Sequence, residues 1–349
     1  MIISGEILSE LDKQISNYCA YNNIFGALRI TLRDKIFFQK SFGYADIEKK
    51  IQFTKRSMFT FYSLSKPFCV MGLMKLKDKG LVDIDTHPKT YVPEANGFDE
   101  RVTVRHLLHH VSGLPDFYLN QEFKNKYSTG YASQIREQMK EIVKYPQAFE
   151  PGTKTQCANI NMILCALIIE NVSGMPYDEY MKREIFEPLD MRSAVVDNEN
   201  LHIDGRVLGY DLVEGEITQI NKCYDWLFGA GDIVGTVDDV YALNLAIKNK
   251  LLLNEDTWRD ILTPYPINSF GCGCTVSYWH GKYCITHNGG HLGFRTLHIQ
   301  IPEDDFDIIF LSNSGYGNAR NDISEMIHTA FYDDSVLEIS SIEMDKGYI

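Results

Sequence analysis

The chain has 349 residues, of which 44% are apolar and 23% charged, and its formal net charge is −13. A chain of this length can form one large domain or two modest ones, and its composition is ordinary for a globular protein with a sizeable core. The strong negative charge would repel nucleic acid and anionic lipid surfaces, so we expect neither nucleic acid nor a membrane as a partner.

The cysteines and the N-terminus predict a cytoplasmic protein. Eight cysteines are irregularly spaced and several lie in apolar runs such as Phe68-Cys69-Val70, which favours reduced thiols over a disulfide framework. The N-terminal segment Met-Ile-Ile-Ser-Gly-Glu lacks the basic start and long apolar stretch of a signal peptide. No apolar run approaches the roughly 18 residues of a membrane span.

Periodicity in the first part of the chain predicts a helix followed by a hairpin. Residues 6–21 carry apolar side chains at helical spacing. Residues 27–43 then alternate around the polar turn Arg33-Asp34-Lys35, which is typical of a β-hairpin.

The middle of the chain is mostly helical. Residues 64–79 are apolar over most of their length, so this helix should be largely buried, and it should stop at Gly80. Further helices are predicted over 103–110 with Thr103 as N-cap, over 159–172 ending at Ser173-Gly174, and over 236–250 after Thr236.

The last third returns to strands, over 283–287, 293–301 and 306–312, before a final helix over 318–331. Strands at both ends with helices between them predict an α+β fold, in which an antiparallel sheet is formed from both termini and flanked by helices. We expect a single domain over 1–335, with a mostly helical region inserted at approximately 63–205, and a C-terminal tail over 336–349.

The segment Ser63-Leu64-Ser65-Lys66 places a hydroxyl and an amine three residues apart, on one face of a first helical turn. The helix N-terminus adds partial positive charge where an alkoxide would develop. A lysine shielded from water can lose its proton and act as a base toward Ser63. The alternative is that this common tetrapeptide arose by chance and that the serine only caps a helix.

Several other segments of the chain favour a catalytic role for that tetrapeptide over a chance occurrence. These are Val102–Pro115, Glu150-Pro-Gly-Thr153, Ile168–Gly174, Phe186-Glu-Pro-Leu-Asp-Met191, Gly229–Thr236, and His287-Asn288-Gly289 with Gly293-Phe294-Arg295. In this order, from about residue 20 to about 332, the chain resembles the serine β-lactamase and penicillin-binding-protein superfamily, in particular its class C β-lactamase-like and carboxypeptidase or esterase-like branch. The resemblance implies a β-lactamase/transpeptidase-like fold, with Ser63 as nucleophile and Lys66 as its base.

The second motif of that superfamily, Tyr-x-Asn, is altered here. Counting from Pro151-Gly152-Thr153, the tyrosine position falls on Cys157 and the asparagine on Asn159. Asn159 could position Lys66 or bind a substrate amide. A cysteine side chain is shorter than tyrosine by most of a ring, so its sulfur should fall short of Ser63. Three possibilities stay open: Lys66 acts alone, a water bridges the gap, or turnover is lost.

The resemblance places the third motif at His287-Asn288-Gly289. His287 would be a polar group facing Ser63, and Gly289 would let a substrate backbone approach. An oxyanion hole would use the backbone N–H of Ser63 and another from this strand. Arg295 could bind a substrate carboxylate through its guanidinium fork, with an ordinary salt bridge as the alternative. The expected substrate-binding residues are therefore Tyr62, Cys157, Asn288, Gly289, Gly290 and Arg295, and the expected catalytic residues are Ser63, Lys66, Asn159 and His287.

Two further groups have residue types that bind metals. The first is His106, His109 and His110, and the second is Cys272, Cys274, His280 and Cys284. In the second group the Gly-Cys-Gly-Cys alternation predicts that Cys272 and Cys274 lie on one face of a strand. The histidines lie in a segment that resembles a structural element of the superfamily, and the spacing of the second group fits no common zinc pattern. We therefore expect packing roles in both groups and no metal or organic cofactor.

The sequence thus predicts a serine hydrolase that cleaves an ester or amide of a small molecule or short peptide through an acyl-enzyme. Short D-amino peptides, small esters and β-lactams are candidate substrates. A cytoplasmic location favours an esterase or peptidase role. The alternative is a non-catalytic or acylation-only penicillin-binding-like protein, because Cys157 replaces the motif tyrosine.

Overall fold

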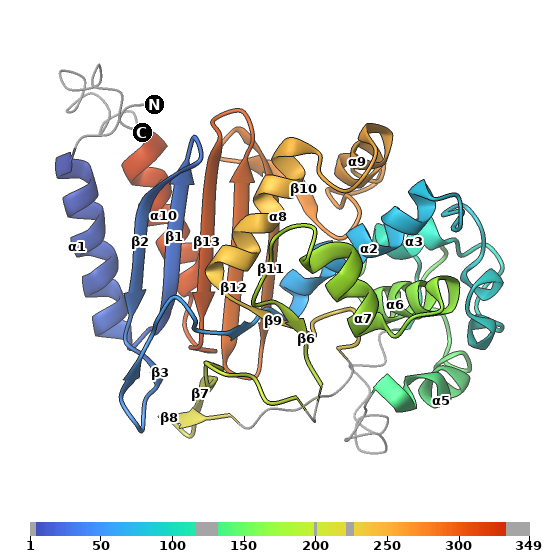
Figure 1. Ribbon diagram of the computed structural model, residues 1–349, viewed down its shortest axis with the longest axis horizontal. Helices are drawn as coiled ribbons and strands as arrows, with labels where there is room; N and C mark the ends of the chain where they lie inside the picture. Colours follow the sequence, from blue (N-terminus) through green and yellow to red (C-terminus); the bar gives the residue numbers. More distant parts are fainter. Residues whose placement is uncertain (1–4, 116–131, 199–200, 221–226, 333–349) are drawn as a thin grey trace.

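The computed structural model describes residues 5–115, 132–198, 201–220 and 227–332, and a six-stranded antiparallel sheet lies at its centre (Figure 1). The strand order is β10-β11-β12-β13-β1-β2. Their bounds are β1 (Gly26–Leu32), β2 (Lys35–Phe42), β10 (Thr275–Trp279), β11 (Lys282–His291), β12 (Phe294–Ile301) and β13 (Phe306–Ser312). Strand β1 pairs with β13 from Gly26↔Ser312 to Leu32↔Phe306. The prediction of an antiparallel sheet formed from both ends of the chain is confirmed.

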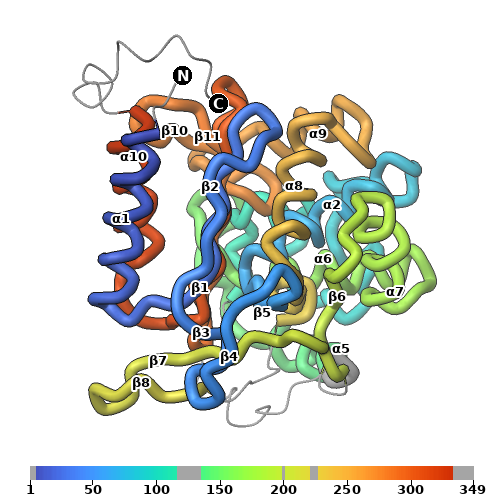
Figure 2. The backbone as a smooth tube through the Cα atoms, turned by 60° about the vertical axis from the view of Figure 1, so that its left-hand side comes forward, coloured from blue at the N-terminus to red at the C-terminus, as the bar shows by residue number. Residues whose placement is uncertain are grey.

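Helices cover both faces of this sheet (Figures 1 and 2). Helices α1 (Gly5–Asn22) and α10 (Ala319–Tyr332) lie side by side on one face. Their buried side chains, including Leu11 and Ile327, join a core with Leu28 and Ile30 of β1. On the other face lie α2 (Lys66–Asp78), α6 (Asn159–Ser173) and α8 (Val237–Asn249). Helix α6 is apolar almost all round and largely buried, as expected for a helix inside a core.

The remaining elements connect these layers. The short helical segments are η1 (Tyr62–Ser65), η2 (Pro88–Thr90), η3 (Pro93–Ala95), α3 (Val104–Leu108), α5 (Ala132–Ile142), α7 (Tyr177–Met181), η5 (Lys182–Phe186) and α9 (Glu255–Leu262). The small sheets are β3 (Tyr44–Asp46) with β4 (Ile51–Gln52), β5 (Phe59–Thr60) with β9 (Ile233–Gly235) and β6 (Val195–Val196), and β7 (Tyr210–Val213) with β8 (Glu216–Gln219). These small sheets are not predictable from the sequence, because their strands are only two to four residues long.

The predicted helix ends have the expected chemistry. The Thr103 hydroxyl accepts a hydrogen bond from the backbone N–H of His106, and Thr236 accepts one from Asp239. Helix α6 ends at Gly174, which has φ +70°. The hairpin between β1 and β2 turns at Arg33 and Asp34, both in the left-handed region.

The predicted strand around Cys272 and Cys274 is wrong. Cys272 and Cys274 do not alternate on a strand, because β10 begins only at Thr275 and the chain bends at Gly273 with φ +65°. A strand-like repeat of glycine and cysteine is a weak signal, since glycine adopts turn conformations readily. The tail predicted over 336–349 lies outside the described residues.

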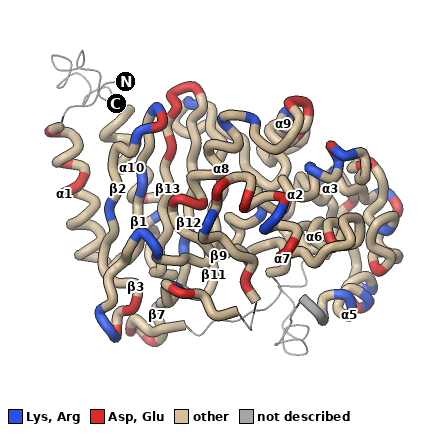
Figure 3. The backbone as a smooth tube through the Cα atoms, in the orientation of Figure 1, with Lys and Arg blue, Asp and Glu red and all other residues tan. Residues whose placement is uncertain are grey.

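Acidic and basic residues are scattered among one another along the chain (Figure 3). Among the described residues, no single helix is long and apolar enough to cross a membrane. Two consecutive helical segments are long and apolar enough only when they are counted together, and the chain bends by 84° between them. These segments are Asn159–Ser173 and Tyr177–Phe186.

The end of α6 offers a test of the backbone conformation. A Cβ atom would meet nothing within 4 Å at Gly174 or at Gly5, so the two glycines differ in backbone conformation and not in available space. We expect Gly174→Ala to lower the free energy of unfolding by about 1 kcal/mol, because its φ is left-handed. Gly5→Ala should change it by less than about 0.5 kcal/mol. Chemical denaturation of both variants makes the comparison, and equal effects would contradict the assigned helix end.

Candidate active site

Ser63 lies in η1, the short 3-10 turn between β5 and α2. The α-helix itself begins at Lys66, so Ser63 precedes the helix by one turn and does not occupy its first turn as expected. Tyr62 immediately before it has φ +49°, a conformation that costs a non-glycine residue about 1–3 kcal/mol. Its ring is buried and packs edge-on against His291, with 5.5 Å between ring centroids. Tyr62 therefore supports the turn that presents Ser63 and is not exposed for substrate contact.

The side chains of Ser63 and Lys66 are in direct contact. Lys66 Nζ lies 2.6 Å from Ser63 Oγ and donates a second hydrogen bond to the backbone oxygen of Ala230 at 3.0 Å. The lysine is fully buried. A hydroxyl touching a buried amine is the arrangement that activates a serine nucleophile by a neighbouring base.

Two histidines near this lysine are uncharged. Burial and then the nearby Lys66 lower the pKa of His287 to about 3, and the same two causes lower the pKa of His110 to about 3. Burial also raises the pKa of Asp232 to about 7, although its Oδ2 accepts a hydrogen bond from Gly229 N–H at 2.8 Å. Imidazoles with such low pKa values are weak bases at neutral pH, and the amine in contact with Ser63 is that of Lys66.

Strand β11 lies directly against the nucleophile turn. A Cβ atom at Gly289 would meet the backbone oxygen of Phe61 at 2.3 Å and the backbone nitrogen of Ser63 at 3.0 Å. The Thr296 hydroxyl of β12 donates to the same Phe61 oxygen at 3.0 Å. Only glycine fits at position 289. The backbone N–H of Ser63 is therefore beside the strand that the sequence analysis expected to complete an oxyanion hole.

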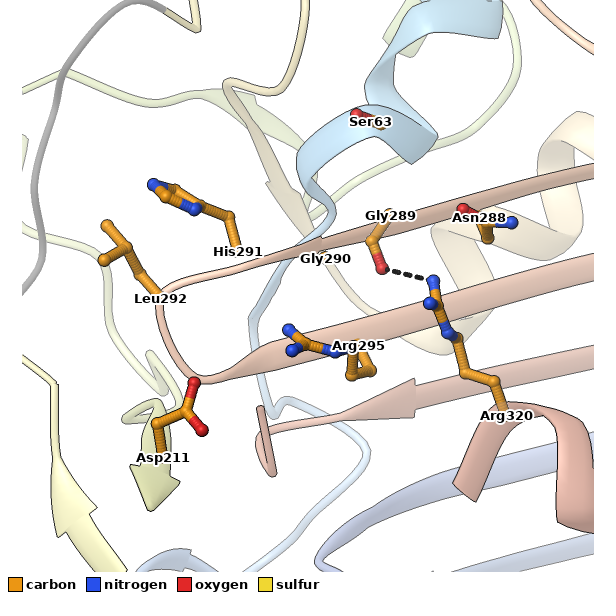
Figure 4. Close-up of a pocket in the computed structure, with 9 residues that line it drawn as sticks. All are labelled: Ser63, Asp211, Asn288, Gly289, Gly290, His291, Leu292, Arg295 and Arg320. Atoms are coloured by element: carbon orange, nitrogen blue, oxygen red, sulfur yellow. Dashed lines mark hydrogen bonds between the residues drawn. The ribbon is translucent and has the colours of Figure 1, made fainter. Parts of the chain in front are cut away.

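An open cleft of about 460 Å³ surrounds this end of β11 (Figure 4). Its lining residues are Ser63, Asp211, Asn288, Gly289, Gly290, His291, Leu292, Arg295 and Arg320. The cleft thus brings together the expected Ser63, Asn288, Gly289, Gly290 and Arg295. His287 is buried and does not line it.

Two arginines lie beside each other in this cleft, on the opposite side of β11 from Ser63 (Figure 4). Arg320 Nη1 donates to the Gly289 oxygen at 3.1 Å, and Arg295 Nη1 donates to the Phe294 oxygen at 2.8 Å. Burial and then the nearby Arg295 lower the pKa of Arg320. Within the ranges that the structure describes, neither guanidinium forms an ion pair with a carboxylate, so the salt-bridge alternative for Arg295 finds no support there.

The altered second motif contacts His110, which is near enough to Lys66 for the lysine to lower its pKa. Cys157 is exposed, and its Sγ is 3.9 Å from His110 Nε2. Asn161, which the sequence analysis did not single out, accepts a hydrogen bond from the Ser112 hydroxyl at 2.7 Å and places its amide nitrogen 3.0 Å from His110 Nδ1. Asn159 is the half-buried first residue of α6. Cys157 and Asn159 do not line the cleft that contains Ser63.

The two groups considered for metal binding are dispersed. His106 hydrogen-bonds within its helix cap, His109 contacts the Phe270 oxygen and the Cys272 sulfur, and His110 faces Asn161. Seven cysteines of the described residues are free thiols, and all except Cys157 are buried. The eighth, Cys223, lies outside the described residues.

Some contributors to the site carried little signal in the sequence. Ala230 and Asp232 belong to the glycine-rich segment 229–236, whose order suggested the superfamily but assigned no role to either residue. Arg320 belongs to a helix far along the chain, and only the packing of α10 against the sheet brings it to Gly289.

Comparison with known proteins adds to this geometry. Residues 11–329 match the model of the family described as Beta-lactamase. Penicillin-binding protein 4* of Bacillus subtilis (strain 168) is 29% identical over 304 residues, which are 80% of this chain but only 65% of that protein. The putative penicillin-binding protein PbpX of the same strain is 27% identical over 335 residues, covering 93% of this chain and 81% of that protein.

A solved structure has the same fold. The penicillin-binding protein from Bacillus halodurans superposes with a TM-score of 0.79 at 22% identity, covering 91% of this chain and 99% of that chain. This similarity confirms the predicted β-lactamase/transpeptidase-like α+β fold. Because the family match covers nearly the whole chain, the protein belongs to the Beta-lactamase family of β-lactamase-like serine hydrolases and penicillin-binding proteins.

Proposed function

We propose that this protein hydrolyses an ester or amide bond through an acyl-enzyme on Ser63. The contact of 2.6 Å between Lys66 Nζ and Ser63 Oγ carries this proposal. The placement of Gly289 against the Ser63 backbone supports it, because a substrate carbonyl beside this strand would be near both groups.

The chemistry follows from these positions. Lys66 in its neutral form accepts the Ser63 proton while Oγ attacks the substrate carbonyl carbon. The tetrahedral oxygen is then stabilised by the backbone N–H of Ser63 and by an N–H of β11. The lysine returns the proton to the departing alcohol or amine, which leaves the acyl group on Ser63. A water molecule, activated by the same lysine, hydrolyses this ester and regenerates the enzyme.

The structure favours Lys66 acting without Cys157. When the amide N–H of Asn161 donates to His110 Nδ1, the proton of this neutral imidazole resides on Nε2, the atom that faces the Cys157 sulfur. His110 cannot accept the thiol proton in this form. Cys157 therefore has no adjacent imidazole base within the described residues, whereas Lys66 contacts Ser63 directly.

The two arginines support a substrate that carries a carboxylate. Arg295 and Arg320 repel each other, and the described residues pair neither with an acid. Asp211 also lines the cleft, so these three side chains together contribute one net positive charge. A bound carboxylate would satisfy the exposed guanidinium N–H groups. A short peptide with a free C-terminus or a small acyl compound with an acidic group has this chemistry.

Labelling of the nucleophile tests the proposed function. We expect a fluorescent penicillin or a fluorophosphonate to modify Ser63, and Ser63→Ala to abolish labelling, with mass spectrometry locating the adduct. Ser65→Ala is a nearby control, because the Ser65 hydroxyl accepts from Ile233 N–H rather than contacting Lys66. An unlabelled but folded protein would refute the hydrolase proposal. An adduct that never turns over would favour the acylation-only alternative.

The proton path can be tested at two positions. We expect Lys66→Met to slow ester hydrolysis by about 10²–10⁴-fold, because it removes the base. Cys157→Ser should change the rate by less than about threefold, since the thiol takes no part in the proposed step. Rates with a chromogenic acyl ester decide this. A large loss in Cys157→Ser, or a large gain in Cys157→Tyr, would show that this position limits proton transfer.

Substrate charge provides a third test. We expect Arg320→Gln and Arg295→Gln each to lower kcat/KM by about 10–100-fold for an ester with a free carboxylate, as for the loss of a charge-assisted hydrogen bond. For the matching neutral ester the change should be less than about threefold. Arg192→Gln serves as a control, because Arg192 is exposed and pairs with Asp190. Equal losses on both esters would indicate damage to the cleft rather than lost recognition.

A further inference from the structure

We propose that His280, Glu325 and His328 form a binding site for a divalent transition-metal ion such as Zn²⁺. The candidate ligand atoms of these three side chains all lie within 4.8 Å of one another. Glu325 and His328 are three residues apart on α10, so their side chains lie on one face of the helix. His280 lies in the turn between β10 and β11. The three candidate ligands therefore come from two separate elements, this turn and α10.

His280 has a left-handed backbone conformation, which is uncommon for residues other than glycine. The turn has two residues, His280 with φ +46° and Gly281 with φ +81°. Asparagine, aspartate or glycine is preferred at the first position of such a turn. Histidine is one of the non-glycine residues that adopt the left-handed conformation more often than others, so it fits this position. Its imidazole meets α10, with Nε2 3.1 Å from Glu325 Oε1.

The local packing limits the motion of both imidazoles. The rings of His280 and His328 stack with 3.5 Å between centroids. Trp279 packs edge-on against both, with centroid distances of 5.4 and 5.3 Å, and Tyr332 stacks on His328. Zinc binds imidazole nitrogen and carboxylate oxygen at about 2.0–2.2 Å, in the plane of the imidazole ring. Because the two rings are nearly parallel, a shared ion requires them to rotate out of the stack until their nitrogens converge.

The donor set selects the kind of ion. Two imidazoles and one carboxylate suit Zn²⁺, Co²⁺ or Ni²⁺, whereas Mg²⁺ and Ca²⁺ prefer sites made of oxygen ligands. His280 and Glu325 are exposed, so an ion can reach the site from solvent and water can complete its coordination.

This site lies at the far end of β11 from the nucleophile. Gly289 lies eight positions after Gly281, a distance of about 26 Å along an extended chain. An ion here would link the β10–β11 hairpin to α10, and the expected effect is on stability rather than on the chemistry at Ser63. The inference is independent of the proposed function.

The test uses the full chain, freed of metal by a chelator. We expect calorimetric titration with Zn²⁺ to show one ion bound per chain, Co²⁺ to give a visible absorption spectrum, and Zn²⁺ to raise the midpoint of thermal unfolding. Mg²⁺ should neither bind in the calorimetric titration nor raise the midpoint of thermal unfolding. His280→Asn keeps a residue that tolerates the turn conformation, and Glu325→Gln and His328→Gln complete the ligand variants. Each should lose at least about tenfold in Zn²⁺ affinity.

Two controls separate this site from adventitious binding. His202→Asn removes an exposed histidine that also lies 3.1 Å from a carboxylate, that of Asp204. Cys157→Ser removes the exposed thiol. Both should bind Zn²⁺ as the unaltered chain does. The proposal is overturned if the unaltered chain takes up no Zn²⁺, if the three ligand variants retain full affinity, or if a control variant abolishes binding.

Discussion

The close approach of β11 to the nucleophile turn is the constraint on which the site depends. The Phe61 oxygen accepts from Thr296, and Gly289 passes so near to Phe61 and Ser63 that no Cβ fits. This contact joins η1, which leads into the helical part of the fold, to strands that lie more than 200 residues later. The sheet in turn is fixed by the pairing of β1 with β13, so the whole antiparallel arrangement sets the position of Ser63 against its neighbouring strand.

Two buried histidines, His287 and His110, are near enough to Lys66 for its charge to lower their pKa values. His287 donates from Nδ1 to the Asn288 oxygen, which leaves its Nε2 as an acceptor, whereas His110 accepts at Nδ1. Burial keeps both rings neutral, and their hydrogen-bond partners require opposite tautomers. A second cation next to Lys66 would make its proton easier to lose, but each imidazole is too deeply buried to carry charge.

The sequence predicted the sheet and the major helices because their signals are local: apolar periodicity, Thr236 as a cap, and Gly174 as a helix end. Motif order indicated Ser63, Lys66 and the third-motif strand for the same reason, since each motif is a short contiguous segment. Contacts made by tertiary packing were not predictable in this way. Arg320 reaches Gly289 from a distant helix, and Asn161 matters because it orients His110.

The length mismatch between β10 and β11 has a consequence for self-association. Strand β10 pairs with β11 only as far as Thr286, so residues 287–291 form a short sheet edge with no strand beside it among the described residues. Unpaired sheet edges can recruit another chain, and proteins limit this by keeping such edges short. Here the open edge spans five residues and contains two adjacent glycines, which pack poorly as strand partners. An open edge this short limits the number of backbone groups that a further strand could pair with.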